Sequence, residues 1–199
     1  VLQAVNASGN WFGIATPAGV AAEVTGLADY TPWLAVGTDT SADPGFQGDF
    51  STLWVDDAGA QTGTVGRIQE GINLVSGSTV YVAPGLYDER ININKAMSLL
   101  GATYGVSKRG YTVPSGYAYD TATESVIRPS TPLELQVVKV AADAVVFDGF
   151  VVANEVCQTG GVYQDLVGID ASMWVISALT FASGLVVLLR MTETHDTSR

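Results

Sequence analysis

The chain has 199 residues, and its 20 acidic side chains outnumber nine basic ones, which gives a formal net charge of −11 at pH 7. A nucleic-acid partner is therefore not expected, because phosphate binding requires clustered Lys and Arg. The single cysteine, Cys157, excludes an internal disulfide framework, and the lone His195 lies in a polar tail, so zinc sites built from His and Cys clusters are also excluded. The acidic surface is compatible with a secreted protein.

Residues 1–34 are predicted to be either the tail of a preceding structural unit or an irregular N-terminal cap. No targeting segment is recognisable at Val1, so we expect the chain to be cut from a longer protein. In both cases the aromatic residues Trp11, Tyr30 and Trp33 are interpreted as packing residues rather than as a platform for sugars.

Residues 35–63 are rich in Gly, Asp, Thr and Ser, and they are predicted to form a loop-rich linker. Their carboxylates suggest a calcium site, but the ligand spacing of an EF-hand loop is absent. We therefore expect no cofactor and interpret the carboxylates as turn residues, with calcium as the alternative. The residues concerned are Asp39, Asp43, Asp49, Asp56 and Asp57.

A helix is predicted over residues 65–75, because apolar side chains recur there at spacings of three and four. These side chains are Val65, Ile68, Ile72 and Val75, and Gly77 is the expected stop signal. The segment Thr79 to Ala102 follows and contains three short apolar runs, each too short for a buried helix. They predict strands at Val80–Val82, Ile91–Ile93 and Met97–Leu100.

This order of elements resembles the opening of right-handed parallel β-helix proteins of the pectin-lyase-like superfamily, which pectin methylesterases share. The resemblance rests on the helix, on Thr79 to Glu89, on Ile91 to Lys95 and on Leu99 to Ala102, and it extends over roughly residues 64–153. It implies an all-β fold, a right-handed parallel β-helix or solenoid over residues 64–199, truncated or complete, with the helix as its N-terminal cap. Because this scaffold hosts lyases, esterases and adhesins alike, it implies no activity.

A long segment without periodicity runs from Tyr104 to Ser125. Segments of this kind are typically functional or disordered. Tyrosines on a rigid scaffold can stack on sugar rings while their hydroxyl groups form hydrogen bonds, which makes these side chains the predicted glycan-binding residues. The alternative is that they fasten the loop to the fold. The four candidates are Tyr104, Tyr111, Tyr117 and Tyr119.

Further strands are predicted at Val126–Ile127, Val137–Val140, Ala144–Phe147 and Phe150–Ala153, with a corner at Asp148-Gly149. The apolar run Met173 to Leu189 is interpreted first as last strands, second as a hydrophobic cap, and only third as a membrane anchor.

The catalytic motifs of the resembling enzymes are not found. Pectin methylesterases as a family use paired Asp residues, Gln residues that hold an oxyanion, and an Arg. Here Asp143 and Asp148 are interpreted as turn carboxylates rather than as an acid and base pair, and Gln136 and Arg128 lack the family's surroundings. The basic residue and calcium-binding Asp groups of polysaccharide lyases are absent as well.

We therefore expect a non-catalytic module of a larger secreted or cell-surface protein. It would act as an adhesin or structural spacer and would bind a polysaccharide or a cell-surface glycan. The alternative is a carbohydrate-active enzyme, either a pectin esterase or a protein similar to polysaccharide lyases. The ligand and the oligomeric state have no signature in the sequence.

Overall fold

The computed structural model describes residues 3–106, 118–131 and 136–153 of the chain. They belong to the first of two compact units, Val1–Val156. Several sequence predictions lie outside the described residues, namely those for Cys157, for His195 and for the apolar run Met173 to Leu189. The division into 1–34, 35–63 and 64–199 stays a prediction.

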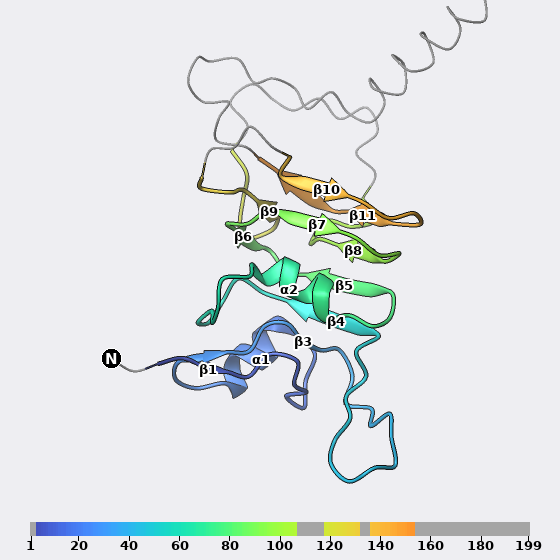
Figure 1. The fold of residues 1–199 in the computed structure, drawn as a ribbon. Helices are drawn as coiled ribbons and strands as arrows, with labels where there is room; N and C mark the ends of the chain where they lie inside the picture. The colour runs from blue at the N-terminus through green and yellow to red at the C-terminus, as the bar shows by residue number, and fades with distance from the viewer. Residues whose placement is uncertain (1–2, 107–117, 132–135, 154–199) are drawn as a thin grey trace, which may run out of the picture. The chain divides into compact units, whose positions relative to one another are not determined.

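The described residues form short helices and strands in the following chain order (Figure 1): β1 (Val5–Asn6), α1 (Pro17–Glu23), β2 (Ala28–Asp29), β3 (Trp33–Leu34), β4 (Thr52–Val55), α2 (Arg67–Leu74), β5 (Thr79–Val82), β6 (Gly85–Tyr87), β7 (Ile91–Ile93), β8 (Ser98–Leu100), β9 (Ser125–Ile127), β10 (Val138–Val140), β11 (Val146–Asp148) and β12 (Phe150–Val152). The predicted strands of the segment 79–102 are confirmed at β5, β7 and β8. Those after residue 125 are confirmed at β9 to β12.

The strands are divided among four small sheets in the described part of the chain. The largest has the order β11-β8-β5-β4-β3, a second has the order β12-β9-β6, and two pairs, β10-β7 and β1-β2, complete the set. Neighbouring strands run parallel except for β3 and β4, which are antiparallel. In Figure 1 the strands β4, β5, β8 and β11 follow one another across the largest sheet.

The prediction of an all-β fold, a right-handed parallel β-helix with an N-terminal capping helix, is wrong. The described residues form a mixed α/β structure with short strands in several small sheets, none of which is a solenoid, and no sheet is closed. Apolar runs specify where strands lie, but they do not specify how the strands are distributed among sheets. The solenoid pattern left out helix α1 and the antiparallel pair of β3 and β4.

Alternating side chains of the central strands point into the core. Ile91 and Ile93 of β7 are buried and Asn92 between them is exposed, as expected for side chains that alternate along a strand. In the largest sheet Leu53, Val80 and Leu99 occupy equivalent register positions, and all three are fully buried. Parallel register thus collects the inward side chains of distant segments into one core.

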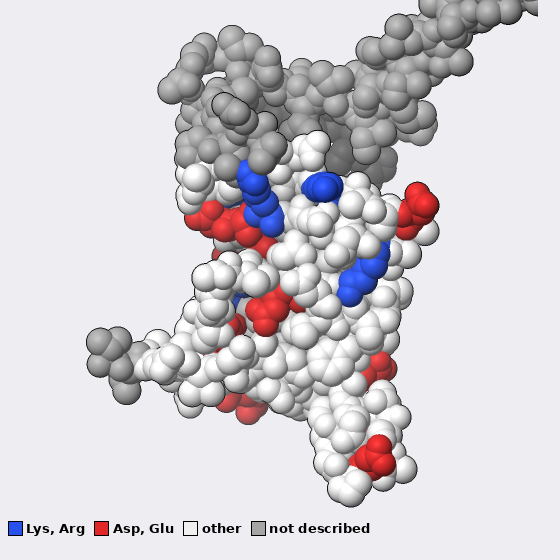
Figure 2. All heavy atoms as spheres, in the orientation of Figure 1, with Lys and Arg blue, Asp and Glu red and all other residues white. Residues whose placement is uncertain are grey.

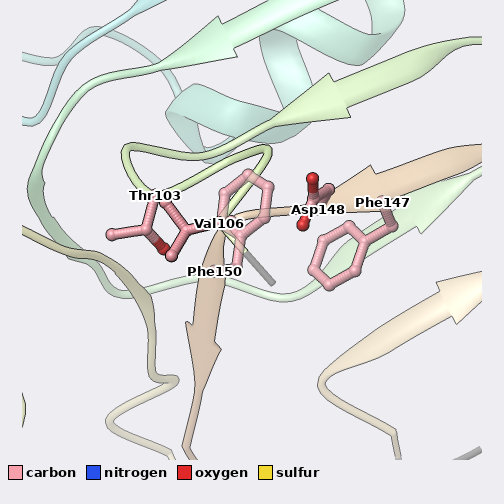
Figure 3. A pocket seen from close by; sticks show the side chains of 6 residues that line it. Thr103, Val106, Phe147, Asp148 and Phe150 are labelled. Atoms are coloured by element: carbon pink, nitrogen blue, oxygen red, sulfur yellow. The ribbon is translucent and has the colours of Figure 1, made fainter. Parts of the chain in front are cut away.

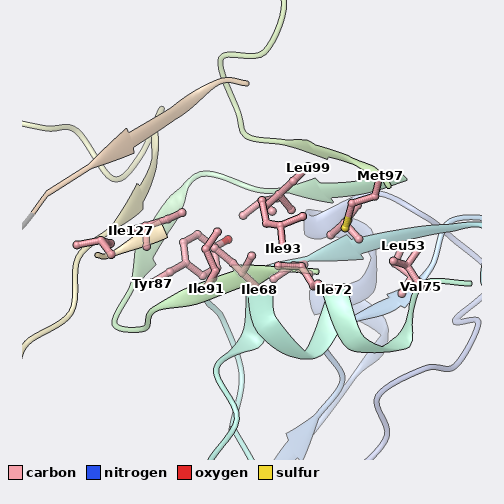
Figure 4. Packing of buried hydrophobic residues seen from close by; sticks show 14 of the residues in the cluster. Leu53, Ile68, Ile72, Val75, Tyr87, Ile91, Ile93, Met97, Leu99 and Ile127 are labelled. Atoms are coloured by element: carbon pink, nitrogen blue, oxygen red, sulfur yellow. The ribbon is translucent and has the colours of Figure 1, made fainter. Parts of the chain in front are cut away.

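Helix α2 covers this core from the side of β4, β5 and β7. Figure 4 shows Ile68 and Ile72 of the helix packed among the aliphatic side chains of the strands. The predicted helix is confirmed, but it ends at Leu74, with Val75 as its C-cap, before the expected stop at Gly77. Its expected role as a cap is wrong, because β4 already pairs with β5 on the side that the helix was expected to cover.

The aromatic residues of the N-terminal segment are packing residues, as predicted. Trp33 is fully buried and its Nε1 donates a hydrogen bond of 3.0 Å to the carbonyl oxygen of Ala15. Tyr30 is also buried and contacts the Trp33 ring with 6.1 Å between the ring centroids. Trp11 packs against the main core and is only partly buried.

A carboxylate from the corner between β6 and β7 caps helix α2. The two oxygens of Glu89 accept hydrogen bonds from the backbone N–H groups of Ile68, at 2.8 Å, and Gln69, at 2.9 Å. These N–H groups have no partner inside the helix, and the negative charge lies at the positive end of the helix dipole. The N-cap residue is Gly66, and a Cβ there would collide with the Glu89 carboxylate, so only glycine leaves room for it.

Replacing Glu89 by Ala should lower the free energy of unfolding by about 1–3 kcal/mol, because two partly buried N–H groups lose their acceptor. Glu89→Gln should cost less, since it keeps one acceptor oxygen and needs no buried charge. Urea denaturation followed by circular dichroism measures both changes. The control is Glu23→Ala, which removes an exposed carboxylate from α1 and should have an effect within about half a kcal/mol. Equal effects of Glu89→Ala and Glu23→Ala would contradict the capping role.

Stability should increase on mild acidification. Burial raises the pKa of Asp56, Glu70 and Glu89 above the ordinary values of 3.8 for Asp and 4.5 for Glu. The folded state therefore binds protons more tightly than the unfolded state, and the stabilisation from protonation is complete below the unfolded pKa values and is lost as the pH rises through the folded ones.

Two other carboxyl groups determine the pH below which stability should fall again. Hydrogen bonds from Ser51 and Ser130 lower the pKa of Asp49 and Asp88, respectively, so their contribution is lost when the pH falls through the folded values, below the ordinary 3.8. The melting temperature should accordingly rise from pH 7 toward about pH 5 and fall again below about pH 4. A melting temperature that falls steadily from pH 7 to pH 5 would show that the buried carboxyl groups do not dominate.

Candidate ligand-binding site

A tight turn after β8 folds against the corner between β11 and β12. The backbone N–H of Gly101 donates a hydrogen bond of 2.8 Å to the carbonyl oxygen of Asp148, and that of Thr103 donates one of 3.3 Å to the carbonyl oxygen of Gly149. The carboxylate of Asp148 then accepts a hydrogen bond of 2.8 Å from the N–H of Gly105 at its Oδ2 atom. The turn, residues 101–106, is thus attached to the corner at both ends.

Gly149 makes this close approach feasible. Its φ angle is +82°, in the left-handed region, and a Cβ at this position would collide with the backbone nitrogen of Tyr104. A side chain would therefore be strained by its own backbone and would also clash with the turn. The predicted corner at Asp148-Gly149 is confirmed. Glycine is needed there for its backbone conformation and also because the backbone of Tyr104 leaves no room for a Cβ.

The turn and the corner enclose a small pocket, which we call the turn pocket. It has a volume of about 230 Å³ and is lined by Thr103, Val106, Phe147, Asp148, Gly149 and Phe150. Figure 3 shows the aromatic rings of Phe147 and Phe150 beside the carboxylate of Asp148. The two rings are stacked, with 4.7 Å between centroids and an angle of 7° between their planes. The pocket thus combines an aromatic wall with one carboxylate and one hydroxyl group.

An aromatic row leads along the sheet to this turn. The rings of Trp54 in β4 and Tyr81 in β5 are register neighbours and stack at 4.9 Å, and Tyr81 contacts the ring of Tyr104 at 5.7 Å. Trp54 and Tyr81 are half-buried, whereas Tyr104 is 49% exposed. The row therefore ends in one ring that is supported on one side and accessible to solvent.

The four predicted glycan-binding tyrosines do not form one cluster in the described residues. Tyr104 stands at the end of the aromatic row, on the turn whose Thr103 and Val106 line the turn pocket, but it is not a lining residue itself. Tyr119 is paired with Arg128, which donates a hydrogen bond to its hydroxyl oxygen and lies 5.6 Å from its ring centroid. Tyr111 and Tyr117 lie outside the described residues.

Sequence reasoning missed the partners of Tyr104. Trp54 and Tyr81 were not considered as site residues, and Phe147 and Phe150 were interpreted only as strand residues. A signal did exist for the first pair, because two aromatic residues at the third position of four-residue strands become neighbours when those strands pair in register. The contact between the turn and the Asp148-Gly149 corner had no signal in the local sequence.

The acidic residues of the segment 35–63 serve mainly as hydrogen-bond acceptors for nearby backbone groups. Asp39 accepts from the N–H groups of Ser41 and Gln47, and Asp49 accepts from that of Ser51. The described part of the chain contains no group of three or more His, Cys, Asp or Glu side chains that could hold a metal ion. The absence of a cofactor, with calcium as the alternative, stays a prediction.

On the face drawn in Figure 2, acidic side chains are dispersed over the described residues, and basic ones lie apart from each other in the upper half of the view. None of the helices in the described ranges has the length and apolar character needed to cross a membrane.

Comparison with known proteins adds no further constraint. No family model, no curated protein and no solved structure matches the chain. The resemblance to the pectin-lyase-like superfamily therefore stays a prediction.

Substitution of Gly149 by Ala should disrupt the turn. The new Cβ must avoid the backbone of Tyr104 and also adopt a left-handed conformation, so we expect a loss of about 2–4 kcal/mol in the free energy of unfolding.

The matched control is Gly105→Ala. Gly105 has a φ angle of +74°, but a Cβ there would meet no atom within 4 Å, so only the conformational cost of about 1–2 kcal/mol remains. Chemical denaturation of both variants measures the difference. Equal losses would show that the close contact between Gly149 and Tyr104 carries no weight.

Proposed function

We propose that the chain is a non-catalytic, glycan-binding module of a larger secreted or cell-surface protein, and that Tyr104 with the turn pocket forms its binding site. One observation carries the proposal. The exposed ring of Tyr104 contacts Tyr81, which in turn stacks on Trp54. The turn that carries Tyr104 also lines a pocket that contains the Asp148 carboxylate and the Thr103 hydroxyl group.

This combination suits the two faces of a sugar ring. The C–H groups on one face of a pyranose pack against an aromatic ring, while the hydroxyl groups around its rim require hydrogen-bond partners. Tyr104 supplies the first, with 49% of its surface exposed. Asp148 and Thr103 in the turn pocket supply the second. The Oδ1 atom of Asp148 takes part in no hydrogen bond among the described residues, so it is available to a ligand.

The remaining rings of the row position Tyr104 and do not themselves contact the sugar. Trp54 and Tyr81 each cover one face of the other, with planes inclined by 24°, and both are half-buried. Tyr104 is the more exposed ring of the row, at 49%. Tyr81 supports the Tyr104 ring from one side, which reduces the conformational freedom that Tyr104 would lose on binding. The row thus contributes rigidity to a single exposed ring.

Replacing Tyr104 by Ala should reduce the affinity for a retained glycan by about tenfold, because the stacking face is lost. Tyr104→Phe keeps the ring and should retain most of the affinity. A glycan array identifies the ligand, and titration calorimetry measures the affinities. The loss of stability in Tyr104→Ala should be about 1 kcal/mol, the value of one aromatic contact.

Phe46→Ala is the matched control, since Phe46 is 50% exposed and lies in the segment 35–63, away from the turn. It should leave glycan binding unchanged. Full binding by Tyr104→Ala would place the site elsewhere, and the same array with Tyr111→Ala, Tyr117→Ala and Tyr119→Ala would then test the other three candidates. Release of reducing ends, unsaturated products or methanol from pectins by the wild-type chain would replace the proposal with the enzyme alternative.

A further inference from the structure

The turn pocket carries a negative charge that no lining residue neutralises. Asp148 is its single ionisable group, and the other lining residues are Thr103, Val106, Phe147, Gly149 and Phe150. The hydrogen bond from Gly105 holds Oδ2 in place at 2.8 Å and leaves Oδ1 for a ligand. An ionised carboxylate accepts hydrogen bonds and donates none, so the pocket favours a ligand group that donates.

The aromatic rings of the pocket favour a donor group that is positively charged. The rings of Phe147 and Phe150 are stacked with 4.7 Å between centroids, and both line the pocket together with Asp148 (Figure 3), so each ring keeps one face that the other does not cover. A carboxylate beside aromatic rings attracts a cation twice, through a charge-assisted hydrogen bond and through the negative charge density of the rings. A neutral hydroxyl group gains less from both interactions. A carboxylate or sulfate group on the ligand would be repelled.

The size of the pocket limits how much of a ligand enters it. Its volume of about 230 Å³ is below the roughly 300 Å³ at which pockets for drug-sized molecules begin. One sugar ring or one of its substituents fits, while the next ring of a chain remains outside, where Tyr104 stands on the same turn. On this proposal the pocket holds one unit of the chain, and Tyr104, which contacts Tyr81 and is not itself a lining residue, holds the next.

We infer that the turn pocket selects an amino sugar with a free ammonium group, such as a glucosamine unit, over neutral, acetylated and acidic sugars. This inference rests on the proposed glycan-binding function and specifies the ligand class of that site. The ammonium group forms its hydrogen bond with Asp148 Oδ1 and lies against the Phe147 and Phe150 rings. The neighbouring sugar ring of the chain stacks on Tyr104.

The experiment compares short oligomers of equal length by titration calorimetry with the full chain at pH 6. The probes are glucosamine, N-acetylglucosamine and galacturonate trimers. We expect the glucosamine trimer to bind at least about tenfold more tightly than the N-acetylglucosamine trimer, and the galacturonate trimer to show no binding. Asp148→Asn, which keeps an acceptor for the Gly105 N–H, should remove this preference.

Asp143→Asn is the control for non-specific attraction, because the whole chain is acidic and attracts any cation. Asp143 is exposed and lies outside the pocket, so its removal changes the net charge by the same amount. It should alter glucosamine affinity by less than about twofold. Equal losses in Asp143→Asn and Asp148→Asn would overturn the inference, since the attraction would then belong to the whole surface.

The outcomes separate this inference from the proposed function. If the N-acetylglucosamine trimer binds as tightly as the glucosamine trimer, and Tyr104→Ala abolishes the binding of both, the amino-sugar preference is wrong and the glycan site stands. If no trimer binds and the glycan array is blank, both are wrong. A wild-type preference for galacturonate would overturn the charge argument directly.

Discussion

The capping of helix α2 by Glu89 is the interaction on which the arrangement of the core depends. The corner between β6 and β7 places this carboxylate at the beginning of the helix, where it accepts hydrogen bonds from Ile68 and Gln69. Arg67, at the first helical position, donates hydrogen bonds of 2.9 and 2.8 Å to the carbonyl oxygens of Ala58 and Gly59. The helix is thereby attached both to the strands that follow it and to the loop that precedes it, which fixes the apolar face of α2 against the sheet.

The candidate site is likewise formed by two segments distant in the sequence that a few hydrogen bonds hold together. The turn after β8 carries no regular structure of its own, and the Asp148-Gly149 corner holds it by three hydrogen bonds. These bonds attach the turn that carries Tyr104 to the corner that lines the pocket. A binding site on such a turn loses little conformational freedom when a ligand arrives. The aromatic row of Trp54 and Tyr81 adds to this effect from the other side of Tyr104.

The candidate site was only partly predictable from the sequence. Tyr104 was identified because tyrosines in a long aperiodic segment suggest a binding surface, and Gly149 was identified because an Asp-Gly pair suggests a corner. Neither signal indicates that the two residues are in contact, because they are separated by 45 positions in the chain. That contact follows from the parallel pairing of β8 with β11, which aligns the ends of the two strands. Tyr119, selected by the same criterion as Tyr104, instead binds Arg128.

The sequence by itself determined several local elements of this protein: the amphipathic helix α2, the short strands β5, β7 and β8 and the glycine corner. Local periodicity carries these features, because each depends on residues within a few positions of one another. Only the tertiary structure decided how the elements combine. The all-β solenoid was wrong because the strands are divided among separate small sheets, one strand pair is antiparallel, and helix α1 lies among the N-terminal strands. Sheet partition depends on contacts between distant segments, and a strand of three or four residues has the same alternating pattern in any of these arrangements.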